Sequence, residues 1–348
     1  MFLGGTALAQ RDFSVVTNLH YGFVIPHHPE VVNLIQGHTK ALEVNLAWKT
    51  DGSKSWHHDY HFPVVGLDFF VSNLGNNLQL GNQYSTIGYV DFPLNAKQNH
   101  FFKTGVGVGY ASKIWNLQDN PKDLFLGSHF NAAILLQYTF KLRLNDRVDF
   151  RTGARITHFS NGSISLPNKG INNATIFLGF SIKQTRETRL ETDVSNPPLI
   201  KNKKVSFSTL ITSGLKQISV DDPKKYQTFS MTNLLDKRVS SKTSWGIGMD
   251  VFYNSGLRTL ITESTTELVG VGKTIQLGGV FSFTKHLDPW EIKIMLGAYV
   301  IDHYKKNGFI YNRFGLRYHL NEHLLLGLSL KTHYARADFA ELGVGWEF

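Results

Sequence analysis

The sequence predicts an all-β protein, a transmembrane antiparallel up-and-down β-barrel of about sixteen strands. Apolar and polar residues alternate with a period of two in runs of roughly 10–14 residues. The connections alternate in length, with short turns at 144–147 and 320–323 and longer polar stretches at 112–128 and 161–170. Long alternating strands with unequal connections are typical of a membrane barrel. A soluble sandwich has the same alternation in shorter strands.

The segment 148–156 shows the alternation clearly. Its even positions are mostly apolar, and its odd positions carry Asp149, Arg151, Gly153 and Arg155. One apolar face and one polar or small face is the pattern of a strand with lipid on one side and a lumen on the other. The arginines predict either a packed ion network in the lumen or the lining of an anion-selective pore.

The two ends of the chain carry further signals. The last strand ends at Phe348, which resembles the C-terminal signature of bacterial outer-membrane proteins. Near the start, the Ala-Leu-Ala tripeptide at 7–9 precedes Gln10, a pattern of signal-peptide cleavage sites. Residues 1–9 are therefore predicted to be the remnant of a signal peptide. No apolar run approaches the ~20 residues that a membrane helix needs.

Two similar halves flank a charged segment. The boundaries are 10–183 for the first barrel repeat, 184–204 for a polar linker or turn, and 205–348 for a second, degenerate repeat. Thr-His-Phe at 157–159 corresponds to Thr-His-Tyr at 332–334. The repeats can close as one barrel of about sixteen strands, which the single terminal signal favours, or as two tandem eight-stranded barrels.

A polar cluster interrupts the apolar face near the end of the first repeat. His158 and Ser160 lie two apart on a predicted strand, so they share a face, and Asn172 begins the next strand with the same outward parity. Histidine can take the serine proton while a third group holds the imidazole. Asn161 and the backbone around Gly162 can supply oxyanion donors. On spacing alone, polar residues at a barrel rim are the commoner explanation.

The order of the strands places this cluster at one membrane surface. If both termini are periplasmic, the seventh strand ends outside and the segment 161–170 is an extracellular loop. The cluster then lies at the edge of the outer leaflet of a bacterial outer membrane, beside lipopolysaccharide.

The stretch 157–172 resembles the signature of the outer-membrane lipid A 3-O-deacylase family (PagL), also labelled acyloxyacyl hydrolase-like. The matching residues are His158, Ser160, Asn161, Pro167, Asn168 and Gly170. The resemblance spans roughly residues 12–183. It implies a serine esterase, with no cofactor or metal, that removes the ester-linked acyl chain at position 3 of lipid A. Ser160 would be the nucleophile and His158 the base, with Asn161, Gly162 and Asn168 around the oxyanion and substrate.

The chain departs from the family pattern at two places. The family's acid is a glutamate, whereas Asn172 stands at the matching position. An amide oxygen can orient a histidine but cannot stabilise an imidazolium by charge. In the second half, His333 is followed by Tyr334 and Ala335, so the serine is missing. His333 also has lumen parity, and the second copy is predicted to be catalytically dead.

The sequence gives less support to other functional classes. The net charge of +9 suits contact with phosphorylated lipid, and no nucleic-acid motif accompanies the dispersed charges. His57, His58 and His61 are either metal ligands or, more commonly, a solvated turn. The alternative to the esterase is a non-catalytic outer-membrane barrel, such as a pore, structural or interaction protein, that retains a degenerate motif. The sequence is compatible with a homo-oligomer or with a larger outer-membrane assembly.

Overall fold

The computed structural model describes residues 13–184, 205–265, 269–334 and 336–348. Within these ranges the chain forms sixteen strands in antiparallel order. The predicted all-β class and the predicted number of strands are therefore confirmed. The expected signal-peptide remnant at 1–9 and most of the expected linker lie outside the described residues. No helix in the described ranges is long and apolar enough to cross a membrane.

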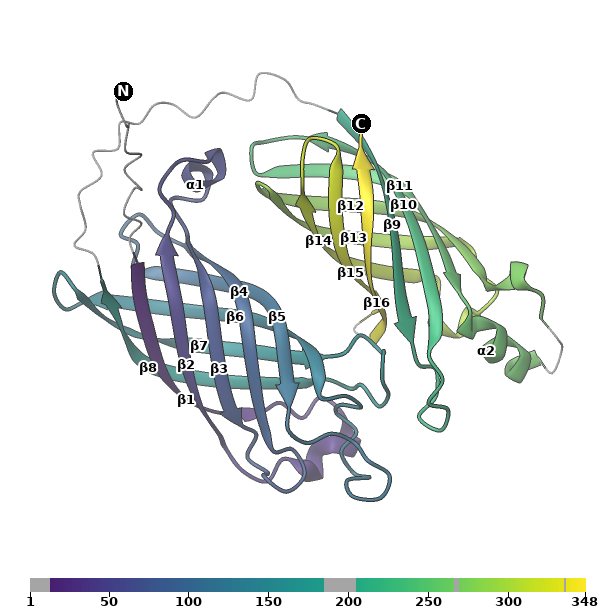
Figure 1. Ribbon diagram of the computed structural model, residues 1–348, viewed down its shortest axis with the longest axis horizontal. Helices are drawn as coiled ribbons and strands as arrows, with labels where there is room; N and C mark the ends of the chain where they lie inside the picture. Colours follow the sequence, from purple (N-terminus) through teal and green to yellow (C-terminus); the bar gives the residue numbers. More distant parts are fainter. Residues whose placement is uncertain (1–12, 185–204, 266–268, 335) are drawn as a thin grey trace, which may run out of the picture. The chain divides into compact units, whose positions relative to one another are not determined.

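The first eight strands form a closed barrel in which neighbours in sequence pair (Figure 1). The strands are β1 Phe13–Val24, β2 Thr39–Lys49, β3 Val64–Asn73, β4 Asn82–Pro93, β5 His100–Ala111, β6 Phe130–Arg143, β7 Val148–Ser160 and β8 Ile171–Lys183. The ring closes where β8 pairs with β1, from Ser14 opposite Lys183 to Val24 opposite Asn173.

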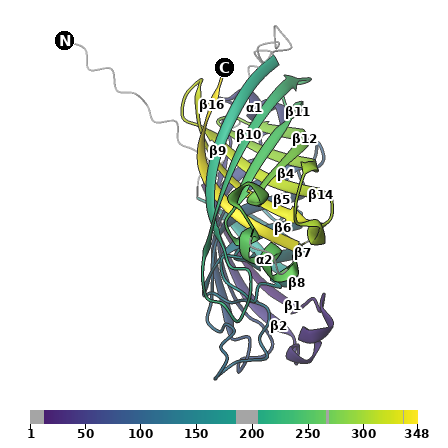
Figure 2. The same cartoon turned by 90° about the vertical axis from the view of Figure 1, so that its right-hand side faces the viewer.

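The last eight strands close a second barrel. They are β9 Val205–Lys216, β10 Tyr226–Arg238, β11 Thr243–Asn254, β12 Ile275–Leu287, β13 Trp290–Ile301, β14 Ile310–His319, β15 Leu324–His333 and β16 Arg336–Glu347. The closing pair is β16 with β9, which lie side by side in Figure 2.

The preference for one barrel of about sixteen strands is thus wrong, and the alternative of two tandem eight-stranded barrels is observed. The physical reason is the pairing of β8 with β1, which satisfies the backbone groups of both edges before the chain reaches β9. A closed ring leaves no edge to which a ninth strand can add.

The period-two alternation separates the two faces of each strand, as predicted. On β8 the side chain of Ile176 is 66% exposed, whereas that of its neighbour Phe177 is 2% exposed. On β7 the side chains of Arg151 and Arg155 are buried, whereas Ile156 is exposed. The exposed belt is apolar, which is the surface that a lipid bilayer covers.

The lumen of the first barrel holds a packed ion network. The carboxylate of Glu43 lies 2.8 Å from Nε2 of His20 and 2.8 Å from Nζ of Lys103. Arg155 donates from both terminal nitrogens to the two oxygens of Asp68, at 2.8 and 3.0 Å. All of these side chains are buried. The lumen arginine Arg155 therefore belongs to a packed network rather than to the lining of an open pore.

The second barrel is filled in the same way by different residues. Arg313 pairs with Asp250 at 2.7 Å and with Glu341. Lys293 pairs with Asp236 at 2.8 Å. Both of these buried cations thus have a carboxylate partner, as the low-dielectric interior of a narrow barrel requires.

The connections mostly follow the expected lengths, with one exception. The link between β2 and β3 contains a short helix, α1 Ser55–Asp59. It includes two of the histidines considered as metal ligands. His57 accepts from the Gly52 amide at 3.1 Å, and His58 contacts the Gly52 carbonyl at 2.8 Å. The described residues contain no group of three or more histidines, cysteines or carboxylates arranged to hold a metal ion.

The remaining short helices lie in other connections. They are η1 Pro29–Leu34, α2 Gly256–Thr265, η2 Val271–Thr274 and η3 Lys305–Asn307.

Replacing Arg155 by alanine leaves Asp68 buried without its bidentate partner. Removal of one member of a buried ion pair typically costs about 3–5 kcal/mol. We therefore expect a loss of this size in the free energy of unfolding, measured by urea titration of the full chain in lipid vesicles. Arg143→Ala is the matched control, because Arg143 pairs with Asp146 at 3.0 Å on the exposed surface; such a pair contributes about 0–1 kcal/mol. Equal, small losses for both variants contradict the packed network.

Candidate active site

His158 and Asn172 form a side-chain pair at one end of the first barrel. They stand directly opposite each other in the register of β7 and β8. Nδ1 of His158 lies 2.7 Å from Oδ1 of Asn172. Both side chains are half-buried and follow the outward parity of their strands. The structure therefore joins two of the three residues that the sequence singled out.

This hydrogen bond determines the tautomer of the histidine. With the amide oxygen of Asn172 facing the ring, Nδ1 of His158 is the donor of this hydrogen bond and carries the proton. The other ring nitrogen, Nε2, is then unprotonated in the neutral ring and can act as a base. Ser160 follows two residues later on β7. The unprotonated Nε2 of His158 and the hydroxyl of Ser160 therefore belong to side chains two residues apart on one strand, which point to the same face.

Ser160 is surrounded by hydrogen-bond donors from the loop that follows it. Its Oγ accepts from the Gly162 amide at 3.3 Å and lies 3.4 Å from Nδ2 of Asn168. Gly162 has a φ of +62°, a conformation that glycine adopts without strain. Because both donors lie beside the hydroxyl oxygen, an oxyanion on an acyl carbon bonded to Ser160 Oγ would form close to them.

Asn161, which was expected among the oxyanion donors, is hydrogen-bonded to Asn168, Ser128 and Ser165. Its backbone amide donates to Oδ1 of Asn168 at 3.0 Å, which turns Nδ2 of Asn168 toward Ser160. Its own side chain donates to Ser128 Oγ at 2.8 Å and to the Ser165 carbonyl at 2.9 Å. In the structure, Asn161 orients the donor Asn168 and anchors the loop, while the donors to Ser160 are Gly162 and Asn168.

A second loop, 112–129, lies against the loop of Ser160. The Gly170 amide donates to the Phe125 carbonyl at 3.0 Å. The same loop contains Asp123, a buried carboxyl that accepts from the Phe125 amide at 3.1 Å. Burial raises the pKa of Asp123 to about 7, against the lowering effect of that hydrogen bond. The loop that contacts the loop of Ser160 therefore contains a carboxyl with a pKa near neutrality.

The sequence analysis missed one residue of this neighbourhood, His27. Its Nδ1 lies 3.4 Å from Nδ2 of Asn172. The contact follows from barrel closure, because the Ile25 amide donates to the Asn172 carbonyl at 2.8 Å and extends the β1–β8 ladder. No local pattern in the sequence indicates it, since the two residues are 145 positions apart.

The corresponding position of the second barrel has different surroundings. His333 ends β15, the seventh strand of its barrel, just as His158 lies near the end of the seventh strand of the first. Its side chain is buried, with Nε2 2.9 Å from the Tyr299 hydroxyl and Nδ1 3.7 Å from Asp338. It faces the lumen, as its parity predicts.

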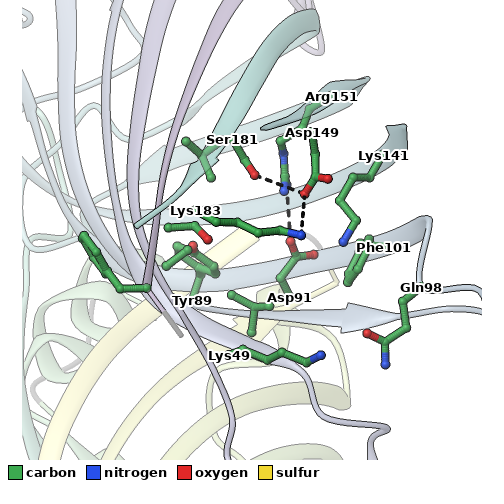
Figure 3. Close-up of a pocket in the computed structure, with 15 residues that line it drawn as sticks. Lys49, Tyr89, Asp91, Gln98, Phe101, Lys141, Asp149, Arg151, Ser181 and Lys183 are labelled. Carbon is green, nitrogen blue, oxygen red and sulfur yellow. Dashed lines mark hydrogen bonds and ion pairs between the residues drawn. The ribbon is translucent and has the colours of Figure 1, made fainter. Parts of the chain in front are cut away.

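A cavity of about 100 Å³ opens in the lumen of the first barrel, far from these residues. Figure 3 shows Lys183 reaching Asp149 and Arg151 reaching Asp91, at 3.8 and 3.5 Å. Asp149 is nine positions before His158 on β7, which corresponds to about 30 Å at ~3.3 Å per residue. The cavity therefore belongs to the opposite end of the barrel and is not the place where Ser160 would meet a substrate.

Fold and site together define a barrel of the outer-membrane type with a serine-centred polar site at one strand end. Family comparison agrees with this class. The family model described as lipid A 3-O-deacylase (PagL) matches residues 41–181, and the model described as acyloxyacyl hydrolase, C-terminal domain, matches residues 205–348. Together they cover most of the chain, and the chain belongs to this family. Family and fold fit an outer-membrane protein with hydrolase activity.

Other comparisons add little. No curated protein matches the chain. Among solved structures, a triple mutant of the Rhodopseudomonas blastica porin is 7% identical, covers 97% of this chain and 99% of its own, and has a TM-score of 0.18. BamA from Haemophilus ducreyi lacking POTRA domains 1-3 is 10% identical, with coverages of 96% and 70% and a TM-score of 0.22. These TM-scores are too low to bear on the fold of this chain.

Proposed function

We propose that this chain is an outer-membrane serine esterase that removes an ester-linked acyl chain from lipid A of lipopolysaccharide. The observation that carries the proposal is the hydrogen bond between His158 Nδ1 and Asn172 Oδ1. It leaves Nε2 of His158 as a proton acceptor on the strand that also presents Ser160. Membership of the lipid A deacylase family supplies the substrate class.

The proposed reaction proceeds in two balanced steps. Ser160 Oγ attacks the ester carbonyl while His158 Nε2 takes its proton, and the oxyanion forms near the Gly162 amide and Asn168 Nδ2. Collapse breaks the ester bond, and the sugar hydroxyl leaves with the proton from His158. Water then attacks the acyl-serine with His158 as base, which releases the fatty acid and restores Ser160.

The location of the site fits a lipid substrate. His158 and Asn172 belong to the outward faces of β7 and β8, which elsewhere carry exposed apolar side chains such as Ile156 and Ile176. With periplasmic termini, these strand ends reach the outer leaflet, where the acyl chains of lipid A lie. The net charge of +9 favours association with the phosphates of that lipid.

Asn172 also supports a second candidate function, a barrel without catalytic activity. An amide is uncharged, so it gives no charge–charge stabilisation to the imidazolium that would form on His158. Among non-catalytic roles, a structural or interaction protein fits better than a pore, because buried ion pairs such as Glu43–Lys103 cross the lumen of the first barrel. Self-association and larger assemblies belong to this second candidate.

Ser160→Ala tests the esterase directly. We expect lipid A from cells that express the wild-type chain to lose one acyl chain, and lipid A from cells that express Ser160→Ala to keep it, as measured by mass spectrometry. His333→Gln is the matched control, because it changes the equivalent histidine of the second barrel and should leave deacylation intact. Identical lipid A in wild-type and Ser160→Ala cells excludes the esterase and leaves the non-catalytic barrel.

Asn168→Asp tests the oxyanion donor. The carboxylate can still accept from the Asn161 amide, but it replaces the Nδ2 donor beside Ser160 with a negative oxygen. Loss of one oxyanion donor typically lowers kcat about 10²–10³-fold, and we expect at least this loss with lipid A in mixed micelles. Electrophoretic mobility of the folded barrel controls for assembly. An unchanged kcat shows that Asn168 does not face the oxyanion.

A further inference from the structure

We infer that His27 is a positioning residue of the candidate site, which selects the orientation of the Asn172 amide and thereby the tautomer of His158. The inference rests on the proposed esterase function and deepens it. It accounts for a site in which an amide stands where the family has a carboxylate.

The geometry places the amide of Asn172 between two imidazoles. Its Oδ1 lies 2.7 Å from Nδ1 of His158, and its Nδ2 lies 3.4 Å from Nδ1 of His27. The barrel's closing ladder holds this arrangement, because the Ile25 amide donates to the Asn172 carbonyl at 2.8 Å. His27 therefore lies two residues after Ile25, whose backbone is hydrogen-bonded to Asn172. Asn172 is also the residue that the His27 side chain contacts.

An amide has two orientations, and only one of them leaves a catalytic base. With Oδ1 toward His158, Nδ1 of that ring carries the proton and Nε2 is an acceptor for the serine proton. After a flip, Nδ2 of Asn172 donates to Nδ1 of His158, which shifts the proton to Nε2 and removes the base. A glutamate has no such choice, because both of its oxygens accept.

The state of His27 decides between these orientations. When Nδ1 of His27 is unprotonated, it accepts from Asn172 Nδ2 and favours the active orientation. When that nitrogen is protonated, it donates instead and favours the flipped amide. The Ile25 carbonyl, 3.1 Å from the same nitrogen, stabilises the protonated state. His27 thus has an acceptor state and a donor state, each with a partner in place.

Other titratable groups face His27 and enter the same equilibrium. The ring of His28 lies 4.7 Å from it, centroid to centroid, and His158 interacts with it electrostatically. A neutral imidazole carries its proton on one of its two ring nitrogens. The acceptor and donor states of His27 are therefore two tautomers, and the neighbouring rings influence which of them is populated.

The test is kcat/KM for lipid A in mixed micelles at about pH 8, where histidine is neutral. His27→Asn keeps an acceptor oxygen near the position of Nδ1, and we expect nearly full activity. His27→Ala loses the acceptor, and we expect about fivefold lower activity, the size of one hydrogen bond.

A double-mutant comparison separates positioning from simple damage to the loop. In an Asn172→Glu background no amide can flip, so His27→Ala should cost less than twofold. His28→Ala is the matched control, since it removes the neighbouring ring but keeps the acceptor for Asn172, and it should retain the activity of the wild type.

Several results overturn the inference. One is an equal loss of activity from His27→Ala in the wild-type and Asn172→Glu backgrounds. A His27→Asn variant as impaired as His27→Ala also contradicts it. Nitrogen-15 NMR of His158 gives a readout that needs no esterase: the Nδ1-protonated tautomer should dominate in the wild type and decline in His27→Ala. An inactive protein with this tautomer shift refutes the esterase but supports the positioning role.

Discussion

The pairing of β1 with β8 is the interaction on which both the fold and the candidate site depend. It satisfies the last free edges of the first eight strands and turns a repeat into a complete barrel. At one end it continues to the bond between the Ile25 amide and the Asn172 carbonyl. The neighbouring ladder between β7 and β8 sets His158 opposite Asn172, and the closing ladder brings the loop of His27 to the other side of the Asn172 amide.

Asn172 shows why orientation matters more than residue type in such a site. In the serine-protease template, replacing the triad acid by asparagine lowers kcat about 10⁴-fold because the histidine takes the wrong tautomer. Here the amide oxygen faces His158. In the proposed esterase this orientation would give the productive tautomer, and only the stabilisation of the imidazolium by charge would be lost. The loss relative to a carboxylate should accordingly be well below about 10⁴-fold. The buried ion network around Glu43 and Arg155 keeps the strands that carry the site in a fixed ring.

The sequence was sufficient for features that depend on local alternation. The outward parity of Ile176 and the lumen parity of Arg155 follow from a period of two. Closure could not be predicted, because one large barrel and two small ones share the same alternation and differ only in whether β8 meets β1 or β9. The role of His27 and the orientation of Asn168 depend on contacts made by loops, for which a single sequence has no periodic signal.

The most direct test of the central claim is covalent labelling of the folded chain with a fluorophosphonate, followed by peptide mass spectrometry. Such reagents modify a serine only when a neighbouring base activates its hydroxyl. The structure predicts one label at Ser160, reduced at acidic pH and abolished in His158→Ala. A folded chain that takes no label, or takes it at another serine with Ser160 unmodified, contradicts the assignment of Ser160 and His158 as nucleophile and base.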